Sequence, residues 1–188
     1  MRRKSRIRIS KTRIRDHFCR LAQYGVDDID RFREQVHDGC AERLRALERR
    51  AESLPPEAQE FLADDASELD IISGLADQLS IVALYRVVEI NTGRMLAHEF
   101  GKAAAKRAST ITEVEKLLKD KKDLELARVP HYRAIKQLRL LNNAIKHKDR
   151  RWHEGEDLNT LAKAYVRLRA KVPAYIFRLA ERMKLRYR

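Results

Sequence analysis

The chain has 188 residues and a formal net charge of +13 at neutral pH. This length fits one domain with a buried core, and the charge favours an anionic partner, nucleic acid before a membrane surface. Two cysteines are too few for a disulfide framework, which indicates a reducing cytoplasm. The pattern also predicts neither a secretory signal nor a membrane span, because it lacks the continuous apolar segments that these require.

Residues 1–15 are expected to form a basic arm. They hold eight Lys and Arg residues and no acid, so the rest of the chain is only mildly basic. Such an arm would contact phosphates electrostatically, without base specificity, or act as a solubilising tail. Residues 16–188 are expected to form a single helical domain.

Apolar residues recur at helical spacing through most of this domain. A first short helix is predicted to end at Gly25, after the apolar residues Ile14, Phe18 and Leu21. A second helix is predicted over about 29–51, where apolar residues repeat every three or four positions. Pro55 and Pro56 mark a break and the start of the next helix.

The next predicted helix, over about 57–105, is the central one, because residues 71–88 are apolar over a wide arc. Thr110 and Glu113 predict a capping box, and Pro130 is expected to begin the following helix. A terminal helix is predicted over 161–183, kinked or split at Pro173. The chain is therefore expected to be an all-α bundle of five to seven helices with a long central helix.

The segment from Arg139 to His147 carries an unusual polar stripe within a predicted helix. Arg139, Asn143 and His147 are spaced at i, i+4 and i+8, so they share one helix face. Two consecutive asparagines are poor helix formers and are not needed for core packing. The segment precedes a basic loop with the only tryptophan, Trp152, and together they predict a site for a phosphate-bearing ligand.

This segment resembles the signature helix of HEPN domains (higher eukaryotes and prokaryotes nucleotide-binding). These are small all-α domains, many of which are metal-independent ribonucleases of toxin–antitoxin, phage-defence and RNA-processing systems. Their usual motif is Arg, four to six residues and His, often with Asn directly after the Arg. Asn143 and His147 match the Asn and His, whereas Asn142 stands where the family has Arg. Arg139 lies one helical turn earlier, with seven residues between it and His147.

The resemblance implies an RNA-binding protein without a cofactor or metal, and it leaves open whether the protein is also a metal-independent endoribonuclease. The expected catalytic residues are His147 as acid or base, Arg139 as a phosphate ligand and Asn143 as the orienting residue. Domains of this family commonly pair, which implies a homodimer. The expected substrate-binding residues lie in or just after the segment and are Asn142, Lys146, Lys148, Arg150, Arg151 and Trp152.

A second interpretation is a non-catalytic helical interaction module, such as an antitoxin, an adaptor or a nucleic-acid-binding accessory protein with a protein partner. Lys146 and His147 would then only complement the helix dipole, and Trp152 would plug the edge of the core. On the central helix, Tyr85 and Glu89 share a face. They would be polar partners of the signature helix or members of an ordinary interhelical network.

A zinc site is not expected. The candidate ligands have no recognised zinc-site spacing, and two of them point to different faces of a helix. They are His17, Cys19, His37 and Cys40.

Overall fold

The computed structural model describes residues 11–147 and 158–185. Over these ranges the chain is helical and contains no strand, which confirms the predicted all-α bundle with a long central helix. The elements are α1 Lys11–Ala51, α2 Pro56–Phe100, α3 Lys102–Arg107, α4 Ile111–Lys122, a short 3-10 helix η1 Leu126–Arg128, α5 Tyr132–His147, α6 Leu158–Arg169 and α7 Lys171–Arg182.

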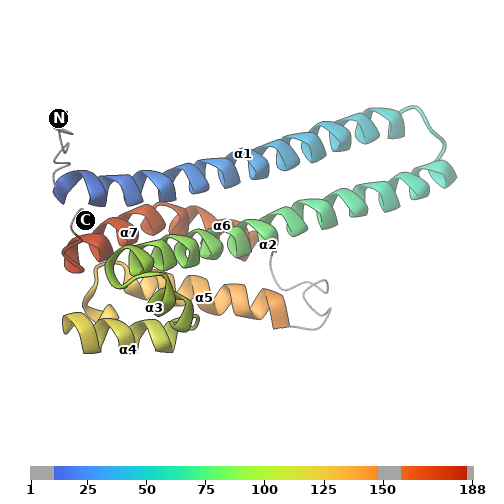
Figure 1. Ribbon diagram of the computed structural model, residues 1–188. Helices are drawn as coiled ribbons and strands as arrows, with labels where there is room; N and C mark the ends of the chain where they lie inside the picture. The colour runs from blue at the N-terminus through green and yellow to red at the C-terminus, as the bar shows by residue number, and fades with distance from the viewer. Residues whose placement is uncertain (1–10, 148–157, 186–188) are drawn as a thin grey trace.

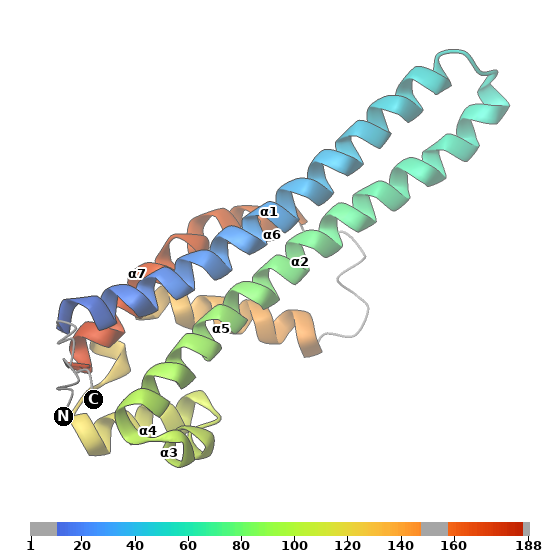
Figure 2. The ribbon, with the colours of Figure 1, turned by 45° about the horizontal axis from the view of Figure 1, so that its top comes forward.

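The two longest helices, α1 and α2, form an antiparallel hairpin that organises the molecule (Figure 1). The remaining helices gather around the half of the hairpin that holds the start of α1 and the end of α2. The other half, which ends at the turn between α1 and α2, projects beyond them in both views (Figure 2). The hairpin therefore has a covered half and a projecting half.

The predicted helix end at Gly25 is wrong, because α1 runs without interruption from Lys11 to Ala51. Gly25 instead lies where α1 approaches α2 closely. A Cβ atom on Gly25 would lie 2.8 Å from the Cγ2 atom of Val87. The small distance between the two packed helices, and not a chain reversal, therefore explains why residue 25 is a glycine.

α1 begins at Lys11, so residues 11–15 of the predicted basic arm are part of a helix. Ile14 and Phe18 are buried in the core, which draws this end of the chain into the helix. Arg15 packs over the ring of Phe177 at 4.3 Å and forms an ion pair with Glu181 at 3.3 Å. Residues 1–10 lie outside the described part of the chain.

The predicted helix boundaries at proline and threonine are largely confirmed. Pro56 is the first residue of α2, and Pro173 lies in the first turn of α7, after a break at Ala170 that splits the terminal helix. The capping box is present, with the Glu113 amide donating to Thr110 Oγ1 at 3.3 Å and the Thr110 amide donating to Glu113 at 2.8 Å. The helix predicted to start at Pro130 starts at Tyr132 instead.

The core forms where the second half of α2 is covered by its neighbours. Its fully buried side chains include Leu84 and Leu96 of α2, Leu138 of α5 and Ile176 of α7. Burying one such side chain contributes about 1.5–3 kcal/mol, so these contacts dominate the docking of α5 and α7 on α2. The core thereby brings the polar segment of α5 against the central helix.

Polar groups tie α1 to α6 and to α2. The hydroxyl of Tyr165 in α6 donates to Asp30 at 2.8 Å, and Arg169 forms an ion pair with the same carboxylate. One turn further along α1, Arg33 contacts the buried carboxylate of Asp77 in α2 at 2.6 Å. These pairs set the position of α1 along α2 and α6.

α2 also contains a stretch, within Gln59–Phe100, that is long and apolar enough to cross a membrane by length and composition alone. The sequence predicted no such stretch because it has no long uninterrupted apolar run. The helix qualifies by its mean hydropathy, which tolerates a few charged residues. In the most apolar window 44% of the residues are buried inside the protein. Packing in the core accounts for much of this apolar character.

Two glycines of α1 provide a test of the close contact at Gly25. Replacing Gly39 with Ala, where no atom lies within 4 Å of the new Cβ, is expected to stabilise the protein by about 1 kcal/mol. Gly25→Ala has the same helix-propensity gain but overpacks the contact with the stiff Val87 side chain. We expect it to be less stable than Gly39→Ala by about 1–3 kcal/mol in urea unfolding. Equal stabilities would contradict this account of Gly25.

Candidate functional site

The polar segment of α5 is divided between the protein interior and its surface. Arg139 is half-buried and Asn142 is buried, whereas Asn143, Lys146 and His147 are exposed. From Arg139 to His147 the helix rises about 12 Å. The helix face predicted for the site therefore starts against the core and ends at an exposed helix terminus. The other predicted binding residues, Lys148, Arg150, Arg151 and Trp152, lie outside the described residues.

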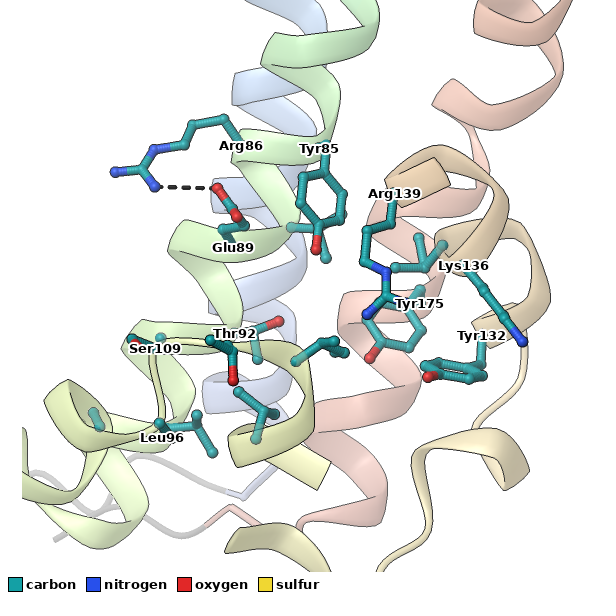
Figure 3. Close-up of a pocket in the computed structure, with 18 of the residues that line it drawn as sticks. Tyr85, Arg86, Glu89, Thr92, Leu96, Ser109, Tyr132, Lys136, Arg139 and Tyr175 are labelled. Carbon is teal, nitrogen blue, oxygen red and sulfur yellow. Dashed lines mark hydrogen bonds and ion pairs between the residues drawn. The ribbon is translucent and has the colours of Figure 1, made fainter. Parts of the chain in front are cut away.

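A cavity of about 300 Å³ lies beside Arg139 (Figure 3). We name it the Arg139 pocket. It is bounded by α2, by α5, by the segment from α3 to the start of α4, and by one side chain of α7. Its polar lining residues are Tyr85, Arg86, Glu89, Thr92, Lys106, Ser109, Thr110, Tyr132, Lys136, Arg139 and Tyr175. Among the predicted site residues that the structure describes, Arg139 lines it and the others do not.

Arg139 reaches from α5 toward Tyr175, between Tyr85 and Tyr132 (Figure 3). Its Nε atom is buried and has no hydrogen-bond partner within the described part of the chain. A buried donor without an acceptor is costly, by about 1–3 kcal/mol and more for a charged group. An oxygen atom of a bound ligand would remove this cost.

The charge of the pocket is positive. Arg86 is neutralised by Glu89, with 3.1 Å between Nη1 and Oε2. The remaining cations of the lining, Lys106, Lys136 and Arg139, form no ion pair with a carboxylate of the described residues. Uncompensated cations in a concave site attract anionic ligands.

Three tyrosines of the pocket remain neutral phenols near neutral pH. Burial raises the pKa of Tyr85, with a further contribution from the Glu89 carboxylate. Burial and a hydrogen bond donated to Glu115 raise the pKa of Tyr132 to about 12. Burial likewise raises the pKa of Tyr175. The phenols therefore add aromatic surface and hydroxyl groups to the pocket without adding negative charge.

The start of α4 forms one wall of the pocket, but side chains at this helix end already form hydrogen bonds with its donor groups. Glu113 accepts hydrogen bonds from the Thr110 amide at 2.8 Å and from the Ser109 hydroxyl at 3.1 Å. These bonds, first that from Thr110, lower the pKa of Glu113, so a carboxylate occupies this helix end. An anionic ligand would therefore meet its cationic partners on α5 and not at the start of α4.

Sequence reasoning missed Tyr132, Lys136 and Tyr175 as site residues. Tyr132, Lys136 and Arg139 are spaced at i, i+4 and i+7, so the helical pattern carried a signal for this face. For Tyr175 it carried none, because α7 meets the pocket only through tertiary packing. Tyr85 and Glu89, noted on the central helix, line the same pocket as Arg139.

The described residues contain no group of three or more His, Cys, Asp or Glu side chains that could hold a metal ion. The four candidate zinc ligands have separate surroundings. Cys40 is buried, the thiol of Cys19 donates to the carbonyl oxygen of Pro173 at 3.8 Å, and His37 contacts Asp77 at 3.1 Å.

Comparison of the chain with models of protein families, with curated proteins and with solved structures finds no match. The features of the protein that bear on its function are therefore the chemistry of the Arg139 pocket and the polar segment of α5.

The raised pKa of Tyr132 can be tested by alkaline titration. A phenol whose pKa is raised from 10 to about 12 by folding contributes stability that is complete below pH 10 and is lost as the pH rises toward 12. We expect Tyr132→Phe to remove a late component from the absorbance titration of tyrosinate at alkaline pH. Glu115→Gln should shift that component to lower pH, because the anionic acceptor is gone. An unchanged titration in Tyr132→Phe would contradict the assignment.

Proposed function

We propose that this protein is a helical RNA-binding protein whose Arg139 pocket holds one nucleotide unit of single-stranded RNA. The observation that carries the proposal is the half-buried Arg139, whose Nε atom lacks a partner in a cavity with two further unpaired cations. The reducing environment indicated by the composition supports a cytoplasmic location.

The phosphate is the ligand group that this lining fits best. A guanidinium presents several donors in a plane and binds phosphate oxygens in a bidentate manner, while a lysine ammonium acts as a point charge. Arg139 and Lys136 lie one turn apart on α5, so both can approach the same anion. The hydroxyls of Tyr85 and Tyr175 are neutral donors in the same lining.

The size and the aromatic content of the pocket favour a ligand that also carries a base and a sugar. A cavity of about 300 Å³ lies at the small end of ligand sites, which suits a single nucleotide and not a longer segment. Stacking of a base on an aromatic ring contributes about 1–3 kcal/mol and tolerates different bases. The basic composition and the resemblance of 139–147 to the HEPN signature helix favour RNA as the polymer.

The proposed activity is RNA binding without RNA cleavage at the Arg139 pocket. Cleavage through attack by the 2′-hydroxyl requires an acid or base at the same phosphate as the stabilising cation. His147 is exposed and does not line the Arg139 pocket. Two turns of α5 separate it from Arg139, a rise of about 12 Å.

Substitution of Arg139 tests the pocket directly. Arg139→Gln is expected to weaken binding of labelled single-stranded RNA about tenfold, measured by fluorescence anisotropy at fixed salt. The matched control is Arg133→Gln, which removes the same charge from an exposed position of α5 outside the pocket. We expect the control to change affinity by less than threefold. Equal losses in both variants would mean that only net charge matters and would contradict the pocket.

Substitution of His147 separates binding from cleavage. His147→Ala is expected to bind RNA within twofold of the wild type, because the side chain is outside the pocket. Incubation of labelled RNA without metal is expected to give no product that depends on His147. Cleavage by the wild type that is lost in His147→Ala, with binding retained, would instead establish a ribonuclease and overturn the binding-only proposal.

A further inference from the structure

The projecting half of the hairpin carries a second apolar stripe in addition to the one that joins α1 to α2. The joining stripe on α2 includes Leu62 and Leu69, which are buried. Ile72, Leu75 and Leu79 follow a different line at i, i+3 and i+7, and they are 43%, 41% and 55% exposed. A pair of helices with one buried and one open stripe is half of a four-helix bundle.

α1 presents an accessible flank on the same side of the hairpin. A groove of about 320 Å³ runs between the two helices, with Ala46 and Leu47 of α1 opposite Leu69 and Ile72 of α2. Gly39, one helical turn before Arg43, has no atom within 4 Å of where a Cβ would stand. Small residues on this flank allow a further helix to approach closely.

The charges that border this groove are of opposite sign on its two sides. Arg43 and Arg50 border it on α1, and Asp65 and Glu68 border it on α2. The polarity extends along the chain, because residues 51–85 contain eight Asp and Glu residues and no Lys or Arg. A partner for this flank must therefore carry an acidic edge and a basic edge side by side.

We propose that the partner is a second copy of this chain, which docks through the same flank to form a four-helix bundle. A twofold axis parallel to the hairpin places α1 of one copy beside α2 of the other. The basic edge around Arg43 and Arg50 then faces the acidic edge around Asp65 and Glu68 of the second copy, and the apolar stripes meet between them. A twofold axis perpendicular to the hairpin would pair α1 with α1 and bring like charges together.

The dimensions of the flank approach those of a standard dimer interface. From Phe32 to Arg50 α1 rises about 27 Å, and two helices side by side are about 20 Å wide. The flat area of this outline is somewhat smaller than the roughly 800 Å² that each partner buries in a standard interface, and the relief of the side chains adds to it. The residues that line the groove and the residues that line the Arg139 pocket do not overlap, so this inference does not depend on the proposed function.

The mass in solution tests the proposal. We expect light scattering coupled to size-exclusion chromatography to give twice the 22.0 kDa mass of one chain at micromolar concentration. Leu79→Glu should shift the protein to a single-chain mass with unchanged helical circular dichroism, since Leu79 is 55% exposed within one chain. The matched control is Leu140→Glu on α5, whose leucine is 57% exposed. It should remain a dimer. A wild-type monomer, or a dimer that Leu79→Glu leaves intact, would overturn the proposal.

Charge reversal tests the orientation of the two copies. Arg43→Glu with Arg50→Glu makes both edges acidic and is expected to raise the dimer dissociation constant at least tenfold. Adding Asp65→Lys and Glu68→Lys restores opposite edges, so the fourfold variant should dimerise again with itself. Recovery in the fourfold variant supports the pairing of α1 with α2 of the other copy. Failure to recover, in a variant with native helical content, would contradict that pairing.

Discussion

The wide apolar arc in the second half of α2 is the constraint on which the rest of this structure depends. A helix that is apolar over most of its circumference must be covered on several sides, and α1, α3, α5, α6 and α7 all pack on α2. The residues that require this cover are Ile81, Leu84, Met95 and Leu96, all fully buried. The first half of α2 lacks this all-round apolar character, so among the described helices only α1 lies along it and the hairpin projects there.

Buried polar groups in this protein fall into two kinds, and the difference locates the site. Asp77 is paired with Arg33, and Asp30 is bound by Tyr165 and Arg169, so these charges are compensated within the fold. Removing one member would leave an uncompensated buried charge, which is strongly destabilising. Arg139 differs because it has no carboxylate partner in the described part of the chain and lines the pocket. Of the four buried side-chain atoms without a partner among the described residues, which are Arg15 Nε, Asn91 Oδ1, Arg139 Nε and Asn142 Oδ1, the Arg139 atom is the one whose residue lines the pocket. A donor that the fold does not satisfy is suited to a ligand.

The two proposed surfaces lie in different parts of the hairpin and need different partners. The Arg139 pocket is in the covered half, where α5 and α7 supply the cation and the aromatic side chains. The open stripe around Leu75 and Leu79 is in the projecting half, where no further helix of the described residues covers it. Dimerisation through the projecting half would place two Arg139 pockets in one assembly. Multivalent binding of a single RNA strand would follow from such an arrangement.

Local pattern alone was sufficient for the helical class, the capping box at Thr110 and the break before Pro173, because each depends on neighbours within a few residues. It also identified Arg139 and the polar face at Tyr85 and Glu89 on a second helix. It failed at Gly25, where a small residue has the same local signature whether a chain turns or two helices touch. Helical spacing grouped Arg139 equally well with His147 or with Tyr132 and Lys136. Only the docking of α5 on α2 decided between them, because the choice of buried face depends on residues distant in the chain.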